Sequence, residues 1–424
     1  MNASKPAMTL KMRYLQLALV SLAGGAIYPL VYMRQNFELS MLEALSMTAA
    51  ELQACYALLG TLFVITYVPS GWLADRFQPR HLMAGSLVAT GLIGIWFSSF
   101  PSQAAVQVIF VLWGITSGLT FWAAMIKAVS LIAPLAAQGR FFGWLEGGRG
   151  AVEALLATLA IALFAWLTSQ TPVPEAGALR VVVILYSGVA MLTAWPLLYW
   201  LRVDEAASDV DARTDSEGPA SLWRDLKLLA QNPNLWLAGM VMLSGYQLFW
   251  ATYSFSAFIQ IALGLSVISA GAITVARLWM RPIGAVVSGY LSDWSSRQLV
   301  LAALLCSGAV ALMCFSLFEV GVASIGVLAM VLVIGLMTYG ARGVFWATLA
   351  DCEVPDRVKG LAIGCLSLIC YAPDVVQPIA EAMVLGDAPD PSAYRDYYFS
   401  VALIAMLGSG LALWLHKRVR AAKR

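Results

Sequence analysis

Gly71-Trp72-Leu73-Ala74-Asp75-Arg76 follows the second long apolar run of the chain, and Gly289-Tyr290-Leu291-Ser292-Asp293 follows the eighth. The pattern Gly-x-Leu-x-Asp thus recurs at equivalent places, 218 residues apart. A second pair of segments repeats in the same way, because Phe121-Trp122-Ala123 of the fourth run has a counterpart in Phe345-Trp346-Ala347 of the tenth. The sequence therefore indicates a chain built from two similar halves.

The composition is that of a membrane protein. Of 424 residues, 60% are hydrophobic and 12% are charged, against about half and about a quarter in soluble domains. Twelve spans of about 20 apolar residues would use about 240 residues and leave room for short loops and one linker. Apolar runs predict helices at 14–36, 49–70, 82–100, 104–130, 141–168, 180–201, 234–261, 267–291, 299–318, 321–350, 359–385 and 397–416. We expect an all-α membrane protein with twelve transmembrane helices in two pseudo-symmetric six-helix bundles.

One long polar stretch separates the two halves. It is rich in Ser, Gly, Pro and acidic residues, a composition typical of a solvated linker. Its acidic residues are Asp204, Glu205, Asp209, Asp211, Asp215 and Glu217. The expected domains are an N-terminal bundle over 1–201, a cytoplasmic linker over 202–233 and a C-terminal bundle over 234–424.

The distribution of basic residues predicts the orientation in the membrane. Of the 26 Lys and Arg residues, 18 lie in the two tails and the loops on their side, and two, Arg180 and Arg395, lie in loops of the other side. Cytoplasmic loops carry the excess of basic residues in membrane proteins. Both termini and the linker are therefore expected in the cytoplasm, with the chain in the inner membrane.

Signatures of enzymes and of metal sites are absent from the sequence. It has no HExxH, GxSxG or Walker pattern, and its two histidines, His81 and His416, lie at predicted helix ends. The six cysteines never form a CxxC pair, so neither a disulfide framework nor a metal site is expected. The net charge of +2 and the dispersed basic residues argue against nucleic-acid binding. We expect a monomer in the lipid bilayer that has no cofactor and is not an enzyme.

The twelve-helix plan with its repeated Gly-x-Leu-x-Asp resembles the major facilitator superfamily over nearly the whole chain. The first helix, with Arg34-Gln35-Asn36-Phe37, is similar to the organophosphate:phosphate antiporters of that superfamily. In that branch an arginine of the first helix and one of the seventh bind the phosphate, and Arg34 matches the first. The seventh helix here has Tyr246-Gln247-Leu248-Phe249-Trp250 where the second is expected. The resemblance implies secondary active transport by alternating access.

Six basic residues lie within the predicted helices, where each costs about 2.5–3.5 kcal/mol to insert. They are Arg34, Lys127, Arg149, Arg277, Arg281 and Arg342. Arg34 is predicted to contact substrate, with contact to outer headgroups as the alternative. Arg277 and Arg281 share one helix face, so they either bind an anion or form internal salt bridges. Lys127 and Arg342 lie on helices that line the central path in the superfamily, and we predict that they contact substrate.

Carboxylates within the predicted helices are candidates for coupling. Glu146, Arg149 and Glu153 form one stripe along the fifth helix, either for proton coupling or as a structural network. Asp374 follows a proline, and it is either a proton site or a partner of an arginine such as Arg342.

The Gly-x-Leu-x-Asp segments are candidates for gating. Glycine permits close helix approach, and an aspartate at a helix end can hold a partner and release it. The gating residues are predicted to be Gly71, Asp75, Arg76, Gly289 and Asp293. Asp293 is expected to matter less, because no basic residue follows it directly.

The excess of bases over acids within the helices favours a small organic anion as substrate, namely a sugar phosphate, a sulfonate or a carboxylate. The expected site lies midway between the bundles, and Trp250 and Tyr339 are further candidates for substrate contact. A proton or phosphate is the candidate counter-substrate. A proton-coupled carrier of neutral or amphipathic compounds, a channel and a non-transporting sensor with the same fold are the alternatives.

Overall fold

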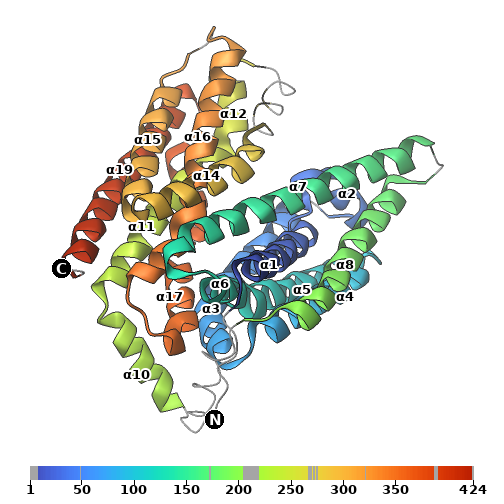
Figure 1. Ribbon diagram of the computed structural model, residues 1–424. Helices are drawn as coiled ribbons and strands as arrows, with labels where there is room; N and C mark the ends of the chain where they lie inside the picture. The colour runs from blue at the N-terminus through green and yellow to red at the C-terminus, as the bar shows by residue number, and fades with distance from the viewer. Residues whose placement is uncertain are drawn as a thin grey trace. The chain divides into compact units, whose positions relative to one another are not determined.

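The computed structural model describes residues 8–47, 49–170, 173–203, 219–265, 270, 273, 276–319, 321–385 and 390–422 (Figure 1). Every regular element within these residues is a helix, so the predicted all-α fold is confirmed. The chain divides into two compact units. Unit 1 comprises Met1–Pro134, Ala151–Leu222 and Pro355–Gly364, and unit 2 comprises Leu135–Gly150, Trp223–Val354 and Cys365–Arg424. Most of the acidic linker, residues 204–218, lies outside the described residues.

Unit 1 is a bundle of long helices with buried apolar seams. Its helices are α1 (Leu10–Val31), α2 (Arg34–Leu45), α3 (Ala49–Arg76), α4 (Pro79–Phe97), α5 (Gln103–Gly114), the π-helix η1 (Ile115–Trp122), α6 (Ala123–Ile132), most of α7 (Gln138–Gln170) and α8 (Glu175–Trp200). The short η6 (Asp356–Val358) and the first part of α17 (Lys359–Cys370) also belong to it. Helix α8 packs along α4 and α1, and α3 packs along α5 and η1.

Unit 2 is a second helical bundle. Its helices are α11 (Pro233–Trp250), η4 (Ala251–Ser254), α12 (Phe255–Ile261), α14 (Met280–Trp294), α15 (Arg297–Ser316), α16 (Ser324–Phe345), η5 (Trp346–Asp351), α18 (Pro373–Leu385) and α19 (Pro391–Ala422), together with η2 (Leu135–Ala137) and the start of α7. Most of α10 (Pro219–Ala230) also belongs to it. Helix α15 packs between α19 and α16, and α14 packs along α16 (Figure 1).

Several helices begin where the sequence supplies a cap. The side chain of Asn232 accepts a hydrogen bond from the backbone N–H of Leu235 and is followed by a proline, which starts α11. Asp390 caps α19 in the same way by accepting from Ala393 N–H and from the Ser392 hydroxyl, each at 2.8 Å. These two bonds hold the pKa of its carboxyl below the usual range.

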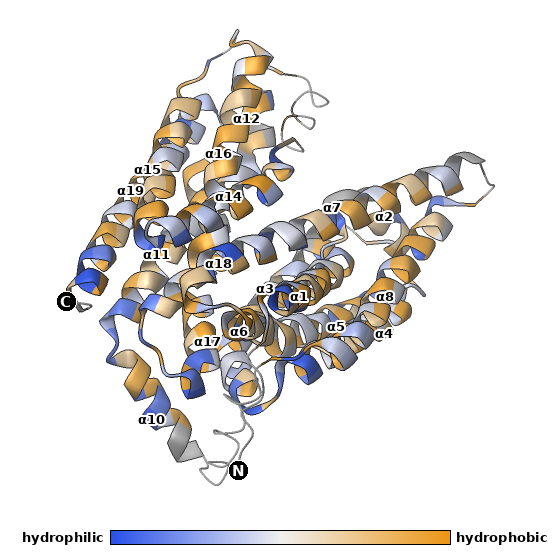
Figure 2. Cartoon of the chain, viewed as in Figure 1, coloured by the Kyte–Doolittle hydropathy of each residue, from blue (hydrophilic) through white to orange (hydrophobic). Residues whose placement is uncertain are grey.

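Ten helices among the described residues are long and apolar enough to cross a bilayer. Figure 2 shows hydrophobic residues along most of the long helices and hydrophilic ones at ends such as the last turns of α19. The predicted seventh span consists of α11 and α12, which are separated by the 3₁₀ helix η4. The predicted eighth span, 267–291, lies partly outside the described residues. The twelve-helix plan therefore holds with interruptions.

Other predicted helices are interrupted as well. The first, expected over 14–36, ends at Val31, and Arg34 starts the separate helix α2. The fourth contains the π-helix η1, which nothing in the sequence predicted. The eleventh breaks between α17 and α18, and α18 starts at Pro373, because proline lacks the N–H that a continuous helix needs.

Candidate functional site

Glu146 on α7 lies at the centre of a buried arginine cluster in unit 2. Its Oε1 contacts Arg281 Nε on α14 at 3.0 Å and Arg342 Nη2 on α16 at 3.1 Å. Its Oε2 contacts Arg149 Nη1 at 3.2 Å. Glu146 is 7% exposed and Arg149 is 5% exposed. The start of α7, α14 and α16, all in unit 2, therefore converge on a single carboxylate, which is the common counter-charge of the three arginines.

Glycines let α7 and α14 approach closely enough for this cluster to form. Gly139, Gly143 and Gly147 of α7 are spaced four residues apart, and a Cβ on Gly143 would lie 2.4 Å from the backbone oxygen of Ala285. A Cβ on Gly150 would lie 2.8 Å from Cδ of Arg281. Larger residues at these places would push α14 away and move Arg281 from Glu146.

Arg342 is held from a second side by aromatic rings of α11. Its guanidinium carbon lies 4.4 Å from the ring centre of Phe249 and 5.7 Å from that of Tyr246. A guanidinium within about 6 Å of an aromatic face gains a cation–π attraction. Arg342 is therefore fixed between a carboxylate and two rings.

Asp374, in the first turn of α18, is held by two neutral donors. Tyr246 Oη donates to its Oδ1 at 2.8 Å, and Trp250 Nε1 donates to the same oxygen at 3.0 Å. Arg342, named as a possible partner of Asp374, pairs with Glu146 in this structure, and the coupling role of Asp374 stays a prediction. Trp250, predicted as a substrate contact, thus has a place beside the candidate coupling acid.

Arg277 lies one turn before α14 and is 6% exposed. Its Nη1 donates a long hydrogen bond of 3.4 Å to Tyr339 Oη, and its guanidinium carbon is 5.7 Å from the Tyr339 ring centre. Its Nε is buried and has no hydrogen-bond partner among the described residues. Arg277 and Arg281, predicted to share a role, therefore differ, since only Arg281 contacts Glu146.

Positive charge exceeds negative charge in this part of the protein. The cluster and its surroundings contain Arg149, Arg277, Arg281 and Arg342 against Glu146 and Asp374. Glu153 lies one turn beyond Arg149 on α7, in the part of that helix that belongs to unit 1. Among these described residues the bases number four and the acids two, or three when Glu153 is added.

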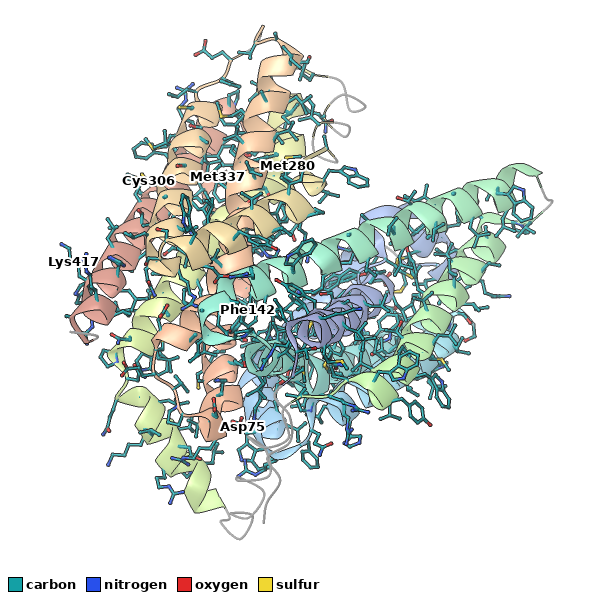
Figure 3. The ribbon with its side chains drawn as sticks, viewed as in Figure 1. Asp75, Phe142, Met280, Cys306, Met337 and Lys417 are labelled. Carbon is teal, nitrogen blue, oxygen red and sulfur yellow. The ribbon has the colours of Figure 1, made fainter. Side chains whose placement is uncertain are left out.

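In unit 1, Asp75 at the end of α3 caps the first turn of α17 (Figure 3). Its two carboxylate oxygens accept from the backbone N–H groups of Gly360 and Leu361, each at 2.8 Å. Lys127 Nζ donates to Oδ1 at 2.5 Å and is itself buried. Gly71 packs directly on the backbone of Gly360, so the predicted need for glycine at the start of the motif is met.

In unit 2, Asp293 caps the start of α7 in the equivalent manner. It accepts from the backbone N–H groups of Gly139 and Arg140 at 2.8 and 2.9 Å, and from Arg140 Nε at 2.9 Å. A Cβ on Gly289 would lie 2.6 Å from the backbone oxygen of Gly139. Each half of the sequence thus caps a helix of the other half with its Gly-x-Leu-x-Asp aspartate.

The two caps differ in the source of their positive charge. Counted from the Phe-Trp-Ala repeat, Lys127 and Asp351 occupy equivalent positions with opposite charges. Lys127 pairs with Asp75, whereas Asp351 accepts from Arg297 Nη1 at 2.9 Å. The basic residue paired with Asp293 comes from the capped helix itself.

Two further predicted residues, Arg34 and Arg76, contact aromatic rings. Arg34 starts α2, and its guanidinium carbon lies 4.5 Å from the ring centre of Tyr56. The side chain of Arg76 is exposed and stacks over Trp72 at 4.0 Å. The cap partners Arg140, Gly360 and Leu361 were not predicted, because a helix N-terminus offers backbone groups that no motif marks.

A family model described as Major Facilitator Superfamily matches residues 14–377. The chain belongs to the Major Facilitator Superfamily. It is therefore a membrane transporter of small molecules rather than an enzyme. The narrower resemblance to organophosphate:phosphate antiporters stays a prediction.

Relatives and solved structures of this superfamily cover nearly the whole chain. The inner membrane proteins YqcE and YihN of Escherichia coli (strain K12) are each 25% identical to it, over 95% and 98% of this chain and 93% and 98% of their own lengths. The E. coli fucose:proton symporter FucP is similar in fold, with a TM-score of 0.74 at 12% identity over 95% of this chain and 98% of that one. This last likeness concerns the fold alone.

Proposed function

We propose that this transporter carries a small organic anion, namely a sugar phosphate, a sulfonate or a carboxylate. The excess of basic over acidic side chains in the cluster and its surroundings, four arginines against Glu146 and Asp374 among the described residues, carries the proposal. A charge in a low-dielectric interior is costly unless a partner compensates it. An anionic substrate would supply the missing negative charge when it binds.

Arginine is well suited to this task. Its planar fork of donors matches the oxygens of phosphate, sulfonate and carboxylate groups. Arg342 is held in place by Glu146 and Phe249, so little conformational freedom would be lost on binding. We assign Glu146 and Arg149 to this fixed framework rather than to proton transfer.

We further propose the orientation and setting. The excess of basic residues in the two tails and their loops supports cytoplasmic termini. The likeness to two inner membrane proteins supports the inner membrane. The two aspartate caps then lie toward the cytoplasm, where their release would open that side during alternating access. A single chain is expected to form the transport unit.

The test is uptake by proteoliposomes that contain the purified protein. Labelled glucose 6-phosphate, glycerol 3-phosphate, isethionate and gluconate are offered separately, with glucose and fucose as neutral controls. Saturable uptake of at least one anion, with none of the neutral sugars, is expected. Uptake of a neutral sugar alone would contradict the proposal, and binding without accumulation or exchange would favour a sensor.

The placement of Asp374 supports a second candidate, a proton-coupled carrier. Its carboxylate is held by two neutral donors, Tyr246 and Trp250, and by no ion pair among the described residues. Both donors favour the ionised form, and protonation would leave one oxygen of Asp374 as an acceptor while adding an O–H that needs an acceptor of its own. A carboxylate in this position can therefore exchange a proton when solvent reaches it.

Asp374→Asn separates the two coupling modes. In a proton-coupled carrier the variant should lose accumulation under an imposed pH gradient and keep exchange of labelled for unlabelled substrate, since exchange needs no net proton movement. Counterflow and pH-driven uptake in the same proteoliposomes provide the measurement. Accumulation at the wild-type level would remove Asp374 from coupling and leave anion exchange as the mechanism.

A further inference from the structure

Arg277 combines deep burial with an unused donor. The residue is 6% exposed, yet Nε has no acceptor among the described residues. Burying a guanidinium N–H without an acceptor is unfavourable, so such groups are rare in folded proteins. A donor of this kind within the membrane is most simply explained by an acceptor that the chain itself does not supply.

The side chain of Arg277 packs against α16 at Gly335, and this contact is called the seat of Arg277. A Cβ on Gly335 would lie 2.6 Å from Cγ of Arg277, so the aliphatic stem lies directly over this glycine. Tyr339 follows four residues later, on the same face of α16, and its hydroxyl meets the guanidinium. The position of the arginine is therefore built into the helix and does not result from a mobile surface side chain.

Tyr339 provides a second donor at the same place. Its hydroxyl oxygen accepts the bond from Arg277 Nη1, and its own hydrogen has no acceptor among the described residues. A hydroxyl can donate one hydrogen bond while it accepts others. An N–H and an O–H thus remain available beside one positive charge.

Arg281 and Arg342 differ from Arg277 because each contacts a carboxylate. Arg281 and Arg342 both contact Oε1 of Glu146, and Arg342 also stacks on Phe249. Their charges are shared with a fixed carboxylate, whereas Arg277 contacts a neutral phenol. The site therefore divides into three arginines that share the carboxylate of Glu146 and one arginine, Arg277, that has no acidic partner among the described residues.

We propose that Arg277 and Tyr339 bind the oxyanion group of the substrate directly. This inference rests on the proposed function and adds the residues that contact the charged group. Phosphate, sulfonate and carboxylate all offer oxygens that accept both donors. The pair therefore selects for an oxyanion of this kind over the neutral analogue of the same compound.

The test measures the KM for uptake of whichever anion of the panel the wild-type protein transports. Arg277→Lys keeps the charge but loses the fork, so KM should rise about tenfold. Arg277→Gln should abolish saturable uptake, and Tyr339→Phe should raise KM about threefold to tenfold. Arg395→Gln, on an exposed arginine, is the matched control and should leave KM unchanged.

Gly335→Ala tests the seat without changing a polar group. Its Cβ would displace the stem of Arg277, so KM should rise as it does in Arg277→Lys. Gly326→Ala is the control on the same helix, because its Cβ would meet only Val322 at 3.7 Å. Size-exclusion profiles and melting temperatures identify any variant that fails to fold. If Arg277→Gln fails to fold, the KM values of Arg277→Lys, Tyr339→Phe and Gly335→Ala test the inference.

The outcomes distinguish this inference from the proposed function. If the wild-type protein transports no anion of the panel, the proposed function fails and the inference fails with it. If the wild-type protein transports an anion and Arg277→Lys, Tyr339→Phe and Gly335→Ala all keep its KM, only the inference is overturned. A raised KM in these variants, with unchanged values in both controls, supports it.

Discussion

Glu146→Gln is expected to destabilise the protein by about 3–5 kcal/mol, because the change leaves three arginines around an uncharged amide. Removing one partner of a buried ion pair is strongly destabilising, since the remaining charges lose their compensation and cannot reach water. The midpoint of thermal unfolding in detergent should fall by about 3–6 °C. Intrinsic tryptophan fluorescence of the purified protein measures it.

Glu153→Gln is the matched control on the same helix. Glu153 is half-buried, whereas Glu146 is 7% exposed and pairs with three arginines, so the Glu153 change should destabilise the protein less. Equal melting temperatures for Glu146→Gln and the wild-type protein would mean that Glu146 does not hold the arginine cluster. Excess transported anion should restore part of the lost stability, because the ligand binds only the folded state.

Asp75→Asn is expected to destabilise the protein by about 2–4 kcal/mol and to slow transport with little loss of substrate binding. The amide cannot balance the charge of Lys127, which is 9% exposed. It also weakens the bonds to the first turn of α17, where a negative charge is favourable. Melting temperature, initial uptake rate and ligand-induced thermal shift together measure these effects.

A second variant distinguishes charge compensation from general damage. Asp75→Asn combined with Lys127→Met removes both charges, so it should recover much of the stability that Asp75→Asn alone loses. If the double variant is no more stable than the single one, Lys127 is not compensated by Asp75.

Asp293→Asn should have the smaller effect of the two cap variants. Its partner Arg140 has a side chain that is 34% exposed, so water can solvate the guanidinium when the carboxylate is lost. The sequence led to the same order for another reason, the presence of Arg76 after Asp75. Arg76 stacks on Trp72 in the structure, and Lys127 supplies the charge instead. A larger loss of uptake rate for Asp293→Asn would contradict this order.

The sequence was sufficient for the fold because long apolar runs have one stable arrangement in a bilayer. Backbone groups in lipid must bond within their own segment, so such runs become helices. Breaks inside a span are harder to predict. Pro373 marks one break, because proline cannot donate the helical bond. The end of α1 at Val31 and the π-helix η1 depend on packing and carry no comparable mark.

For the site, the sequence identified the charged residues but not their partners. A charge in a span is visible in the sequence, and spacing placed Glu146 beside Arg149 correctly. The contacts of Glu146 with Arg281 and Arg342 join positions 135 and 196 residues away, which no local pattern reports. The four-residue spacing suggested the same role for Arg277 and Arg281. The structure shows different contacts, because Arg277 meets Tyr339 of α16 whereas Arg281 pairs with Glu146.

Gly150 and Gly335 each occupy the place where the stem of an arginine crosses a helix. Neither glycine has a functional group, yet any larger residue would move the guanidinium that lies on it. A saturation mutagenesis screen for uptake would therefore find low tolerance at these two positions and read them as active residues. Substitutions that reduce uptake should therefore occur at these two glycines as well as at the charged residues, because the arginine stems need the space that a glycine leaves free.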